Sequence, residues 1–371
     1  MTNACYVGVA GKAVKVKKIY IGIANRARKI KKAYVGVGGK ARLFYSAEQK
    51  LECYGTATGL SQARMYLEAT TVGDYALFGG GEKSSKSSVV DAYNTSLVRS
   101  TPTVFDKPRE YFAATTVGDY ALFGGGSTSF FMDAYNTSLV RSVPTTLSQN
   151  RNYLAATTVG DYGLFGGGST SSDSSIVDAY DASLSRSTPT ALSQARRALA
   201  ATTVGNYALF GGGYVSYHVS SIVDAYNTSL VRSTPTALSQ ARGFFAATTV
   251  GNYALFGGGN PSSNYYSSTV DAYNTSLVRS TPTALSQARA YSAATTVGNY
   301  GLFGGGSPTS NSYSSTVDAY NTSLVRSTSK ALSQARRSLA ATTVGNYGLF
   351  AGGGEYTSLS VFDAVDVYCV D

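Results

Sequence analysis

The sequence offers few residues that could perform catalysis. His218 is the only histidine among the 371 residues, which disfavours a Ser-His-Asp triad and excludes metal sites that need two imidazoles. The recurring Gly-Gly-Gly runs are not followed by Gly-Lys-Ser/Thr, so they do not match phosphate-binding loops. We therefore expect no catalytic residue, no metal and no cofactor, and a protein that is not an enzyme.

Four carboxylates keep a hydrolase open as an alternative. They are Glu82, Glu110, Asp173 and Glu355. A pair of carboxylates facing a glycosidic bond would suit a glycan hydrolase. These four residues occur in different repeats of the chain and share no common spacing, so the sequence favours binding over hydrolysis.

Aromatic and arginine side chains fill the segments that differ between repeats. These segments follow either an unvarying arginine or a triple glycine, and their background is serine and asparagine. Antibody paratopes have this composition, because rigid amphipathic rings give contact area at low entropic cost. Drift of tolerant loops is the alternative, although drift favours small polar residues. We expect a ligand-binding face formed by Tyr66, Tyr111, Tyr153, Arg197, Tyr214, Tyr217, His218, Phe244, Tyr265, Tyr266, Tyr291, Tyr313, Arg337 and Tyr356.

The elements that must position these side chains repeat along the chain. An anchor tyrosine recurs seven times at intervals of 42 to 47 residues, as Tyr75, Tyr120, Tyr162, Tyr207, Tyr253, Tyr300 and Tyr347. The copy from Arg196 to Arg242 predicts four short strands, at residues 199–204, 207–210, 222–226 and 230–238. Four antiparallel strands repeated radially are typical of a β-propeller, so we predict an all-β fold with seven blades. An up-and-down path places every variable segment on one face of the disc.

The two ends of the chain predict how the ring closes. The last copy supplies only three strands, and residues 51–62 align without gaps to residues 229–240, which include the fourth strand of another copy. We therefore expect a seventh blade in which an N-terminal strand pairs with the C-terminal one and leaves no free edge. The predicted domains are residues 1–46 and residues 47–371, with the last blade closed by residues 51–62.

The repeat resembles the kelch repeat. The pattern is an arginine, about ten residues, Gly-Asn-Tyr-Ala-Leu-Phe-Gly-Gly, and then Val-Asp-Ala-Tyr-Asn. The resemblance covers residues 50–371 and implies a kelch-like propeller. The chain departs from it in having no tryptophan, and Arg232 and Ser233 occupy the region of the kelch tryptophan.

One arginine and one aspartate recur unchanged in every repeat. In the propellers that this chain resembles, arginines at this place can line an axial pocket. Seven identical copies are more typical of a scaffold, so we interpret the arginines as paired with backbone carbonyls or with the aspartates. The arginines are Arg64, Arg109, Arg151, Arg196, Arg242, Arg289 and Arg336, and the aspartates are Asp91, Asp133, Asp178, Asp224, Asp271, Asp318 and Asp366.

The N-terminal segment carries the basic charge of the chain. Residues 1–46 contain 11 of the 31 Lys and Arg residues and none of the 21 acidic ones, and tyrosines recur there every 14 residues. Each unit predicts strand, turn and strand, with aliphatic and cationic side chains on opposite faces. We expect an attachment or oligomerisation module that contacts an acidic protein surface or sister chains. The alternatives are nucleic-acid binding by this basic, tyrosine-bearing sheet, which no named motif supports, and cations that are simply solvated. The cations expected to do so are Lys12, Lys15, Lys17, Arg26, Lys29, Lys31 and Lys40.

These Tyr-Val-Gly-Val-Gly-Gly-Lys-Ala units are similar to repeats that head tail-associated proteins of phages. With no apolar run of 18 residues and no signal-peptide core, we expect no membrane insertion and synthesis in a host cytoplasm. The predicted function is receptor binding by a virion-associated homo-oligomer that recognises a cell-surface glycan or protein. The alternatives are a structural fibre or decoration protein without an external ligand, and a protein that stays cytoplasmic or reaches the cell surface by a non-classical route. Cys53 and Cys369 fall on the strands expected to pair, so a disulfide between them stays open.

Overall fold

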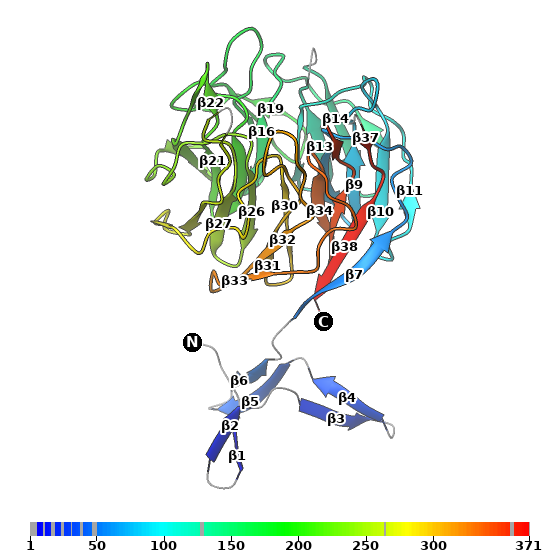
Figure 1. Cartoon of the computed structure of the whole chain (residues 1–371), viewed down its shortest axis with the longest axis vertical. Coiled ribbons are helices and arrows are strands. Elements are labelled where there is room, and N and C mark those ends of the chain that lie inside the picture. The colour runs from blue at the N-terminus through cyan, green and yellow to red at the C-terminus, as the bar shows by residue number, and fades with distance from the viewer. Residues whose placement is uncertain are drawn as a thin grey trace. The chain divides into compact units, whose positions relative to one another are not determined.

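The structure is a computed structural model that describes residues 50–126, 130–262, 265–356 and 360–370, and the backbone of six strands between Tyr6 and Ser46. The chain divides into two compact units, one of residues 1–50 with residue 371 and one of residues 51–370 (Figure 1). Among the described residues, no helix is long and apolar enough to span a membrane.

The N-terminal unit consists of three antiparallel hairpins. They are β1 (Tyr6–Val9) with β2 (Lys12–Lys15), β3 (Ile19–Ile23) with β4 (Arg26–Ile30), and β5 (Lys32–Val37) with β6 (Lys40–Ser46). Each hairpin is a separate two-stranded sheet within the described strands, with the strand, turn and strand that each repeat unit predicts. Of the seven cations expected to contact a partner, Lys17 and Lys31 lie outside the described residues, as do the side chains of the other five.

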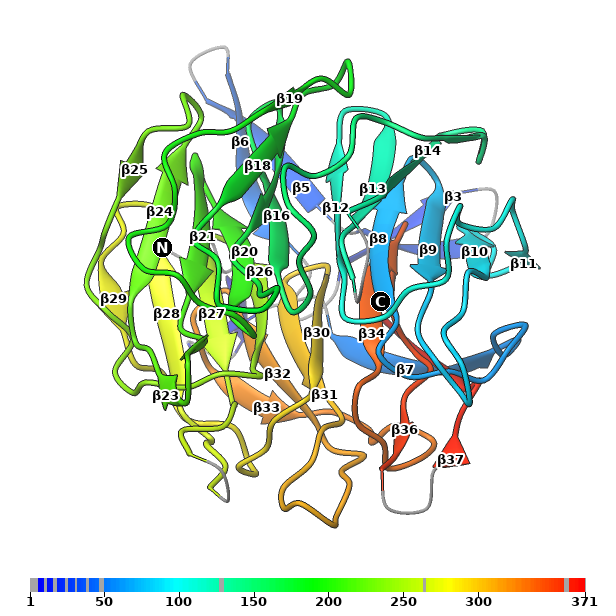
Figure 2. The ribbon, with the colours of Figure 1, turned by 90° about the horizontal axis from the view of Figure 1, so that it is seen from above.

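The second unit contains seven four-stranded antiparallel sheets arranged around an axis (Figure 2). The innermost strands are β8 (Glu68–Val72), β12 (Ala113–Val117), β16 (Ala155–Val159), β20 (Ala200–Val204), β26 (Ala246–Val250), β30 (Ala293–Val297) and β34 (Ala340–Val344). The second strands are β9 (Tyr75–Gly79), β13 (Tyr120–Gly124), β17 (Tyr162–Gly166), β21 (Tyr207–Gly211), β27 (Tyr253–Gly257), β31 (Tyr300–Gly304) and β35 (Tyr347–Ala351).

The outer two strands of each sheet complete the blade. The third strands are β10 (Val90–Asn94), β14 (Met132–Asn136), β18 (Val177–Tyr180), β24 (Val223–Asn227), β28 (Val270–Asn274), β32 (Val317–Asn321) and β38 (Val365–Val370). The fourth are β11 (Arg99–Ser100), β15 (Arg141–Ser142), β19 (Arg186–Ser187), β25 (Arg232–Ser233), β29 (Arg279–Ser280), β33 (Arg326–Thr328) and β7 (Leu51–Ala57). Two small hairpins, β22 (Tyr214–Val215) with β23 (His218–Val219) and β36 (Gly354–Glu355) with β37 (Ser360–Val361), lie in the connections.

The all-β, seven-bladed arrangement confirms the predicted fold class. The fourth strand is much shorter than predicted, because pairing in the example blade ends at Ser233 and not at Leu238. Pro235 follows that strand by two residues, and proline has no backbone N–H to continue a ladder.

The seventh blade joins the two ends of the propeller unit. Strand β7 pairs antiparallel with β38, with Leu51 opposite Val370 and Ala57 opposite Val365. Cys53 lies opposite Tyr368 rather than opposite Cys369, and no disulfide joins these two cysteines. Successive residues of a strand point to opposite faces of the sheet, so the two thiols are directed apart.

Neighbouring blades pack through glycine and phenylalanine. Phe210 and Tyr226 of the fourth blade make an edge-to-face contact at 6.0 Å and join a buried cluster with Leu164 and Val177 of the third blade. A side chain at Gly166 would meet the Phe210 ring at 2.8 Å, so β17 has to end in glycine. The next residue, Gly167, has a φ of +68°, which also favours glycine.

Threonine pairs close the ring at the axis. The second threonine of each innermost strand donates its hydroxyl to the carbonyl of the equivalent threonine in the preceding blade, and the cycle is complete. The same hydroxyl also lies within hydrogen-bond distance of the first threonine of the preceding blade, as at Thr202 and Thr249 (2.9 Å). Since the second hydroxyl has used its proton, the first must donate to it. The second hydroxyl of each blade therefore donates towards the preceding blade, and the first hydroxyl donates towards the following blade.

Candidate functional site

One residue per blade forms a ring around the mouth of the axis, which we call the axial collar. It is the second residue after the unvarying arginine, and its members are Tyr66, Tyr111, Tyr153, Ala198, Phe244, Tyr291 and Ser338. Backbone hydrogen bonds link neighbouring members, for example from the Tyr153 N–H to the Tyr111 carbonyl at 2.8 Å. Such bonds link six of the seven neighbouring pairs, and each blade contributes one variable side chain to the collar.

Every collar residue has left-handed backbone geometry. Their φ angles lie between 51° for Phe244 and 56° for Tyr66. This conformation costs an L-residue about 1–2 kcal/mol, and bulky residues rarely adopt it. Strain of this kind concentrates at functional sites, where the surrounding structure enforces it.

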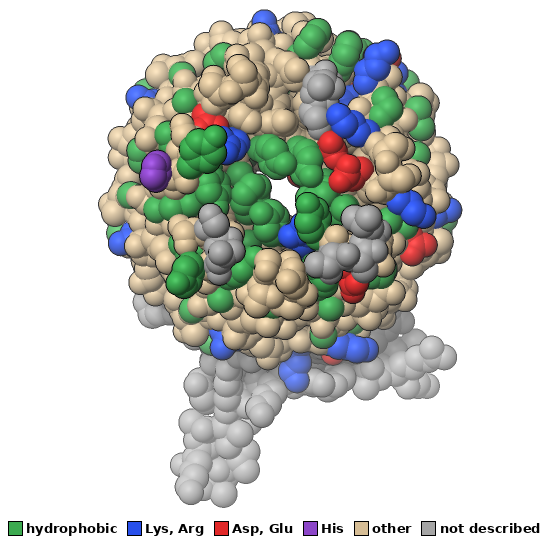
Figure 3. Space-filling view, turned by 45° about the horizontal axis from the view of Figure 1, so that its top comes forward, with side chains coloured by type: hydrophobic (Ala, Val, Ile, Leu, Met, Phe, Trp, Pro, Cys, Tyr) green, Lys and Arg blue, Asp and Glu red, His purple; other side chains and the backbone are tan. Residues whose placement is uncertain are grey.

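The collar side chains contact one another around the mouth. The ring of Tyr111 lies 4.6 Å from that of Tyr66 and stacks on that of Tyr153 at 4.4 Å. On the other side, Phe244 contacts Tyr291 at 4.8 Å and is 6.0 Å from Tyr153. Aromatic side chains therefore line most of the mouth, and hydrophobic side chains gather around the opening in Figure 3.

A pocket of about 560 Å³ occupies the mouth. Its walls include all seven collar residues and, from the connections between second and third strands, Asn260, Tyr266, Ser310 and Tyr356. Both kinds of variable connection meet at this pocket, in agreement with their predicted place on one face. Burial raises the pKa of Tyr111, Tyr153 and Tyr291 above the usual tyrosine value, so their hydroxyls stay protonated at neutral pH.

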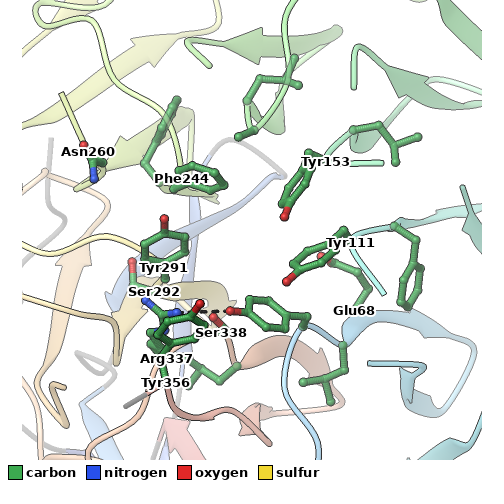
Figure 4. Close-up of a pocket in the computed structure, with 18 of the residues that line it drawn as sticks. Glu68, Tyr111, Tyr153, Phe244, Asn260, Tyr291, Ser292, Arg337, Ser338 and Tyr356 are labelled. Carbon is green, nitrogen blue, oxygen red and sulfur yellow. Dashed lines mark hydrogen bonds between the residues drawn. The ribbon is translucent and has the colours of Figure 1, made fainter. Parts of the chain in front are cut away.

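The walls of the pocket differ in polarity. Tyr111 and Tyr153 lie on one side, whereas Asn260, Ser292 and Ser338 come from blades on the other side (Figure 4). The side-chain oxygens of these last three residues are buried without a hydrogen-bond partner among the described residues. A ligand that supplies hydrogen bonds on that side would satisfy them.

Arg337 completes the mouth where the collar residue is the small Ser338. Its guanidinium lies 4.8 Å from the ring centre of Tyr291 and 4.7 Å from that of Tyr356. Its Nη2 donates to Tyr66 Oη at 3.2 Å, as the dashed line in Figure 4 shows.

Glu68 is a pocket residue that the sequence analysis missed. It is half-buried and begins the innermost strand β8, where each of the other six blades has alanine. Burial raises the pKa of Glu68 to about 8, so the carboxyl is mostly protonated at neutral pH. The signal in the sequence was the single departure from Ala-Ala-Thr-Thr, in Glu-Ala-Thr-Thr.

The unvarying arginines do not line the pocket. All seven are fully buried, and each makes an ion pair with the aspartate of its own repeat. In the fourth blade, Arg196 Nη2 contacts Asp224 at 2.7 Å and the Phe210 carbonyl at 3.0 Å. This confirms the scaffold interpretation, in which both kinds of partner were expected.

The aspartate of this pair also receives other donors. Asp224 accepts from the Ser193 N–H at 3.0 Å and from Arg232 at 2.9 Å. At the equivalent Asp271, burial alone would raise the pKa, but Arg242, the Ser239 N–H and Arg279 together lower it. The Asp271 carboxylate is therefore held ionised at the centre of its blade's polar core.

The predicted ligand residues fall into two groups. Eight line the pocket, namely Tyr66, Tyr111, Tyr153, Phe244, Tyr266, Tyr291, Arg337 and Tyr356. The other six are not among its lining residues: Arg197, Tyr214, Tyr217, His218, Tyr265 and Tyr313. Tyr214 packs on Phe244 at 5.4 Å, whereas Tyr217 is 93% exposed and Tyr265 is 71% exposed.

The variable carboxylates do not converge on the pocket. Asp173 makes an ion pair with Arg197, and Glu82 lies beside Glu110. Burial, followed by the neighbouring Glu110, raises the pKa of Glu82 to about 7. Among the described residues, Glu68 is the one carboxyl that lines the pocket, and no group of three or more His, Cys, Asp or Glu side chains could hold a metal ion.

Comparisons with known proteins identify the fold. No protein-family model matches the chain. A search of curated proteins also found no match. The solved structure described as "Structure of YjhT" is similar with a TM-score of 0.60 at 13% sequence identity, covering 72% of this chain and 98% of that one. At this identity the similarity concerns the fold, and this chain shares with it the architecture of a β-propeller.

Proposed function

We propose that the propeller is a kelch-like, non-enzymatic binding protein that recognises a glycan in the pocket at the axial collar. The observation that carries this proposal is the strained ring of variable, mutually stacked aromatic residues around a preformed concavity. Pockets of this size accept small ligands, and the flat rings offer stacking surfaces. A protein ligand would need a larger contact area than this concavity provides.

Binding is favoured over hydrolysis by the placement of carboxyl groups. Glycosidases use two carboxyl groups that flank the scissile bond. Among the described lining residues the pocket has Glu68 alone, which is mostly protonated at neutral pH. We accordingly assign Glu68 to ligand contact and not to acid–base catalysis.

The basic hairpins of residues 1–46 complete the proposal. We propose that they attach the protein to a virion tail or to sister chains, so that the propeller presents its pocket to a cell-surface glycan. Their excess of cations suits an acidic protein surface. The repeated Tyr-Val-Gly-Val-Gly-Gly-Lys-Ala units support tail association.

Glycan arrays test this function. Purified protein should bind a subset of glycans, and Tyr111→Ala or Tyr153→Ala should abolish binding without lowering the melting temperature by more than a few degrees. Tyr217→Ala is the matched control, because that tyrosine is exposed and is not a lining residue. Binding that survives both collar substitutions would contradict the proposal. Release of reducing sugar would favour the hydrolase, and ordered polymers in electron micrographs without glycan binding would favour the fibre protein.

A further inference from the structure

Two arginines occupy the same position in different blades but have different partners. Arg197 and Arg337 each follow the unvarying arginine of their repeat. Arg197 Nη1 contacts Asp173 Oδ1 at 2.6 Å, and its Nη2 donates to the Ser216 carbonyl at 3.0 Å. Arg197 is thus neutralised by a carboxylate from the preceding blade.

Arg337 has no such carboxylate. Aligning the Ser-Ser-Ile-Val-Asp and Ser-Ser-Thr-Val-Asp segments of the two preceding blades places Tyr313 at the position of Asp173. No ion pair joins Arg337 to a carboxylate of the described residues. The three short propeller segments outside the described residues, 127–129, 263–264 and 357–359, contain only Ser, Thr, Asn and Leu. These three segments therefore contain no acidic residue that could pair with Arg337.

The guanidinium of Arg337 is nonetheless desolvated. The residue is only 8% exposed, and its Nε is buried without a hydrogen-bond partner among the described residues. Its contacts are the rings of Tyr291 and Tyr356 and the hydroxyl of Tyr66, which are all uncharged. Burying a charge is costly unless it is paired, and cation–π contacts offset only part of that cost.

We propose that Arg337 is the anion-recognition residue of the pocket, and that the ligand carries a carboxylate or phosphodiester beside a ring that stacks on the collar. This inference rests on the proposed glycan-binding function and narrows it to acidic glycans. A guanidinium forms paired hydrogen bonds with either kind of anion. The stacked Tyr291 and Tyr356 keep the guanidinium plane fixed, so its free donors need little reorganisation.

The polar wall of the pocket supports an acidic sugar in particular. Ser338 Oγ and Asn260 Oδ1, both buried without partners, lie on the same side of the pocket as Arg337. Sugar hydroxyls flanking the anionic group can donate to these oxygens while the sugar ring contacts Tyr111 or Tyr153. On one wall, Arg337 would contact the anionic group while Ser338 and Asn260 accept hydrogen bonds from the sugar. On the other wall, Tyr111 or Tyr153 would stack on the sugar ring.

Matched acidic and neutral probes test the inference. The pairs are methyl glucuronide with methyl glucoside, methyl galacturonide with methyl galactoside, and glycerol phosphate with glycerol, each titrated into the full-length protein by NMR. We expect at least one acidic probe to bind tenfold or more tightly than its neutral partner. Arg337→Gln should remove this preference, and Arg197→Gln should retain it. A carboxylate preference and a phosphate preference are distinguished by which pair responds.

The outcomes separate this inference from the glycan-binding function. Equal affinity for neutral and acidic sugars, with the same affinities in the Arg337→Gln variant, would overturn anion recognition. The proposed glycan binding would still hold in that case. Failure of every probe would overturn both. Arg337→Lys serves as a second variant, because it keeps the charge but loses the planar donors, and it should retain part of the preference. Melting curves of all variants show whether a lost preference reflects unfolding.

Discussion

Arg337 Nη2 donates a hydrogen bond to Tyr66 Oη across 271 positions of sequence. The bond joins the seventh blade to the first at the mouth of the pocket. Within the seventh blade, β7 and β38 pair at the periphery and join the two ends of the propeller unit. The pocket residues Arg337 and Tyr66 therefore join the last blade to the first at a place separate from the β7–β38 pairing.

The left-handed backbone of the collar gives a stability prediction. Ala198 has a φ of 51°, so Ala198→Gly should relieve strain and raise the free energy of unfolding by up to about 1 kcal/mol. Ala201 lies in strand β20 with ordinary geometry, and Ala201→Gly should lower it by about 0.5–1 kcal/mol. Urea unfolding of the two variants measures the contrast. If both lose stability equally, the collar is not strained.

The buried ion pairs predict a large loss when one partner is removed. Asp224→Ala leaves Arg196 buried beside a carbonyl without its carboxylate, which should cost about 3–5 kcal/mol. Asp161→Asn is the control, because that exposed turn residue is already asparagine in the next blade, as Asn206. Guanidinium unfolding should show a change below about 0.5 kcal/mol for the control. A loss at Asp224 as small as this would show that the arginine can rehydrate.

The raised pKa of Glu68 should make the free energy of unfolding depend on pH. Its pKa is about 8 in the folded state, because of burial, and about 4.3 in an unfolded chain. Between these values the unfolded state releases the proton and the folded state keeps it, so the stability of the wild type falls as pH rises towards 8. Glu68→Ala should therefore be more stable than the wild type by on the order of 1–3 kcal/mol at pH 8, allowing for partial exposure, and equal to it near pH 4.

Denaturation at pH 4, 6 and 8 measures the Glu68 effect. Glu52→Ala, which removes a glutamate at an exposed position of β7, is the matched control. A Glu68→Ala advantage that is the same at all three pH values would rule out titration of this carboxyl as its cause.

The composite blade predicts different effects of two truncations. Removing residues 1–50 should leave the melting temperature of the propeller within a few degrees, because these residues form a separate compact unit. Removing residues 1–57 also deletes β7 and exposes the edge of β38, which should lower the melting temperature and promote aggregation. Scanning calorimetry and size-exclusion chromatography compare them. Equal stability would show that the ring stays closed without β7.

The repeat pattern alone predicted most of the fold. Tyr207 and its equivalents marked the second strands, and the match of residues 51–62 to residues 229–240 located the strand that pairs with β38. The fourth strands were predicted too long, because polar residues near Pro235 are compatible with an extended chain that makes no ladder. Periodicity indicates where strands lie, whereas their ends depend on individual hydrogen bonds.

The site was predicted less completely. Tyr66, Tyr111 and Tyr153 were found from their variability, but their left-handed geometry was not, since bulky residues disfavour it. Arg197 and Arg337 looked equivalent until the structure placed Asp173 beside only one of them. Whether an arginine is neutralised depends on contacts between blades, which one repeat read alone cannot show.

The separation of the threonine ring from the axial collar bears on how such a chain can evolve. Near-identical repeats are prone to exchange by recombination, and the threonines that join neighbours are the same in all of them. Exchanging two repeats would therefore permute the side chains around the mouth while the threonine contacts at the axis are kept. New ligand preferences could arise in this way by reshuffling existing codons.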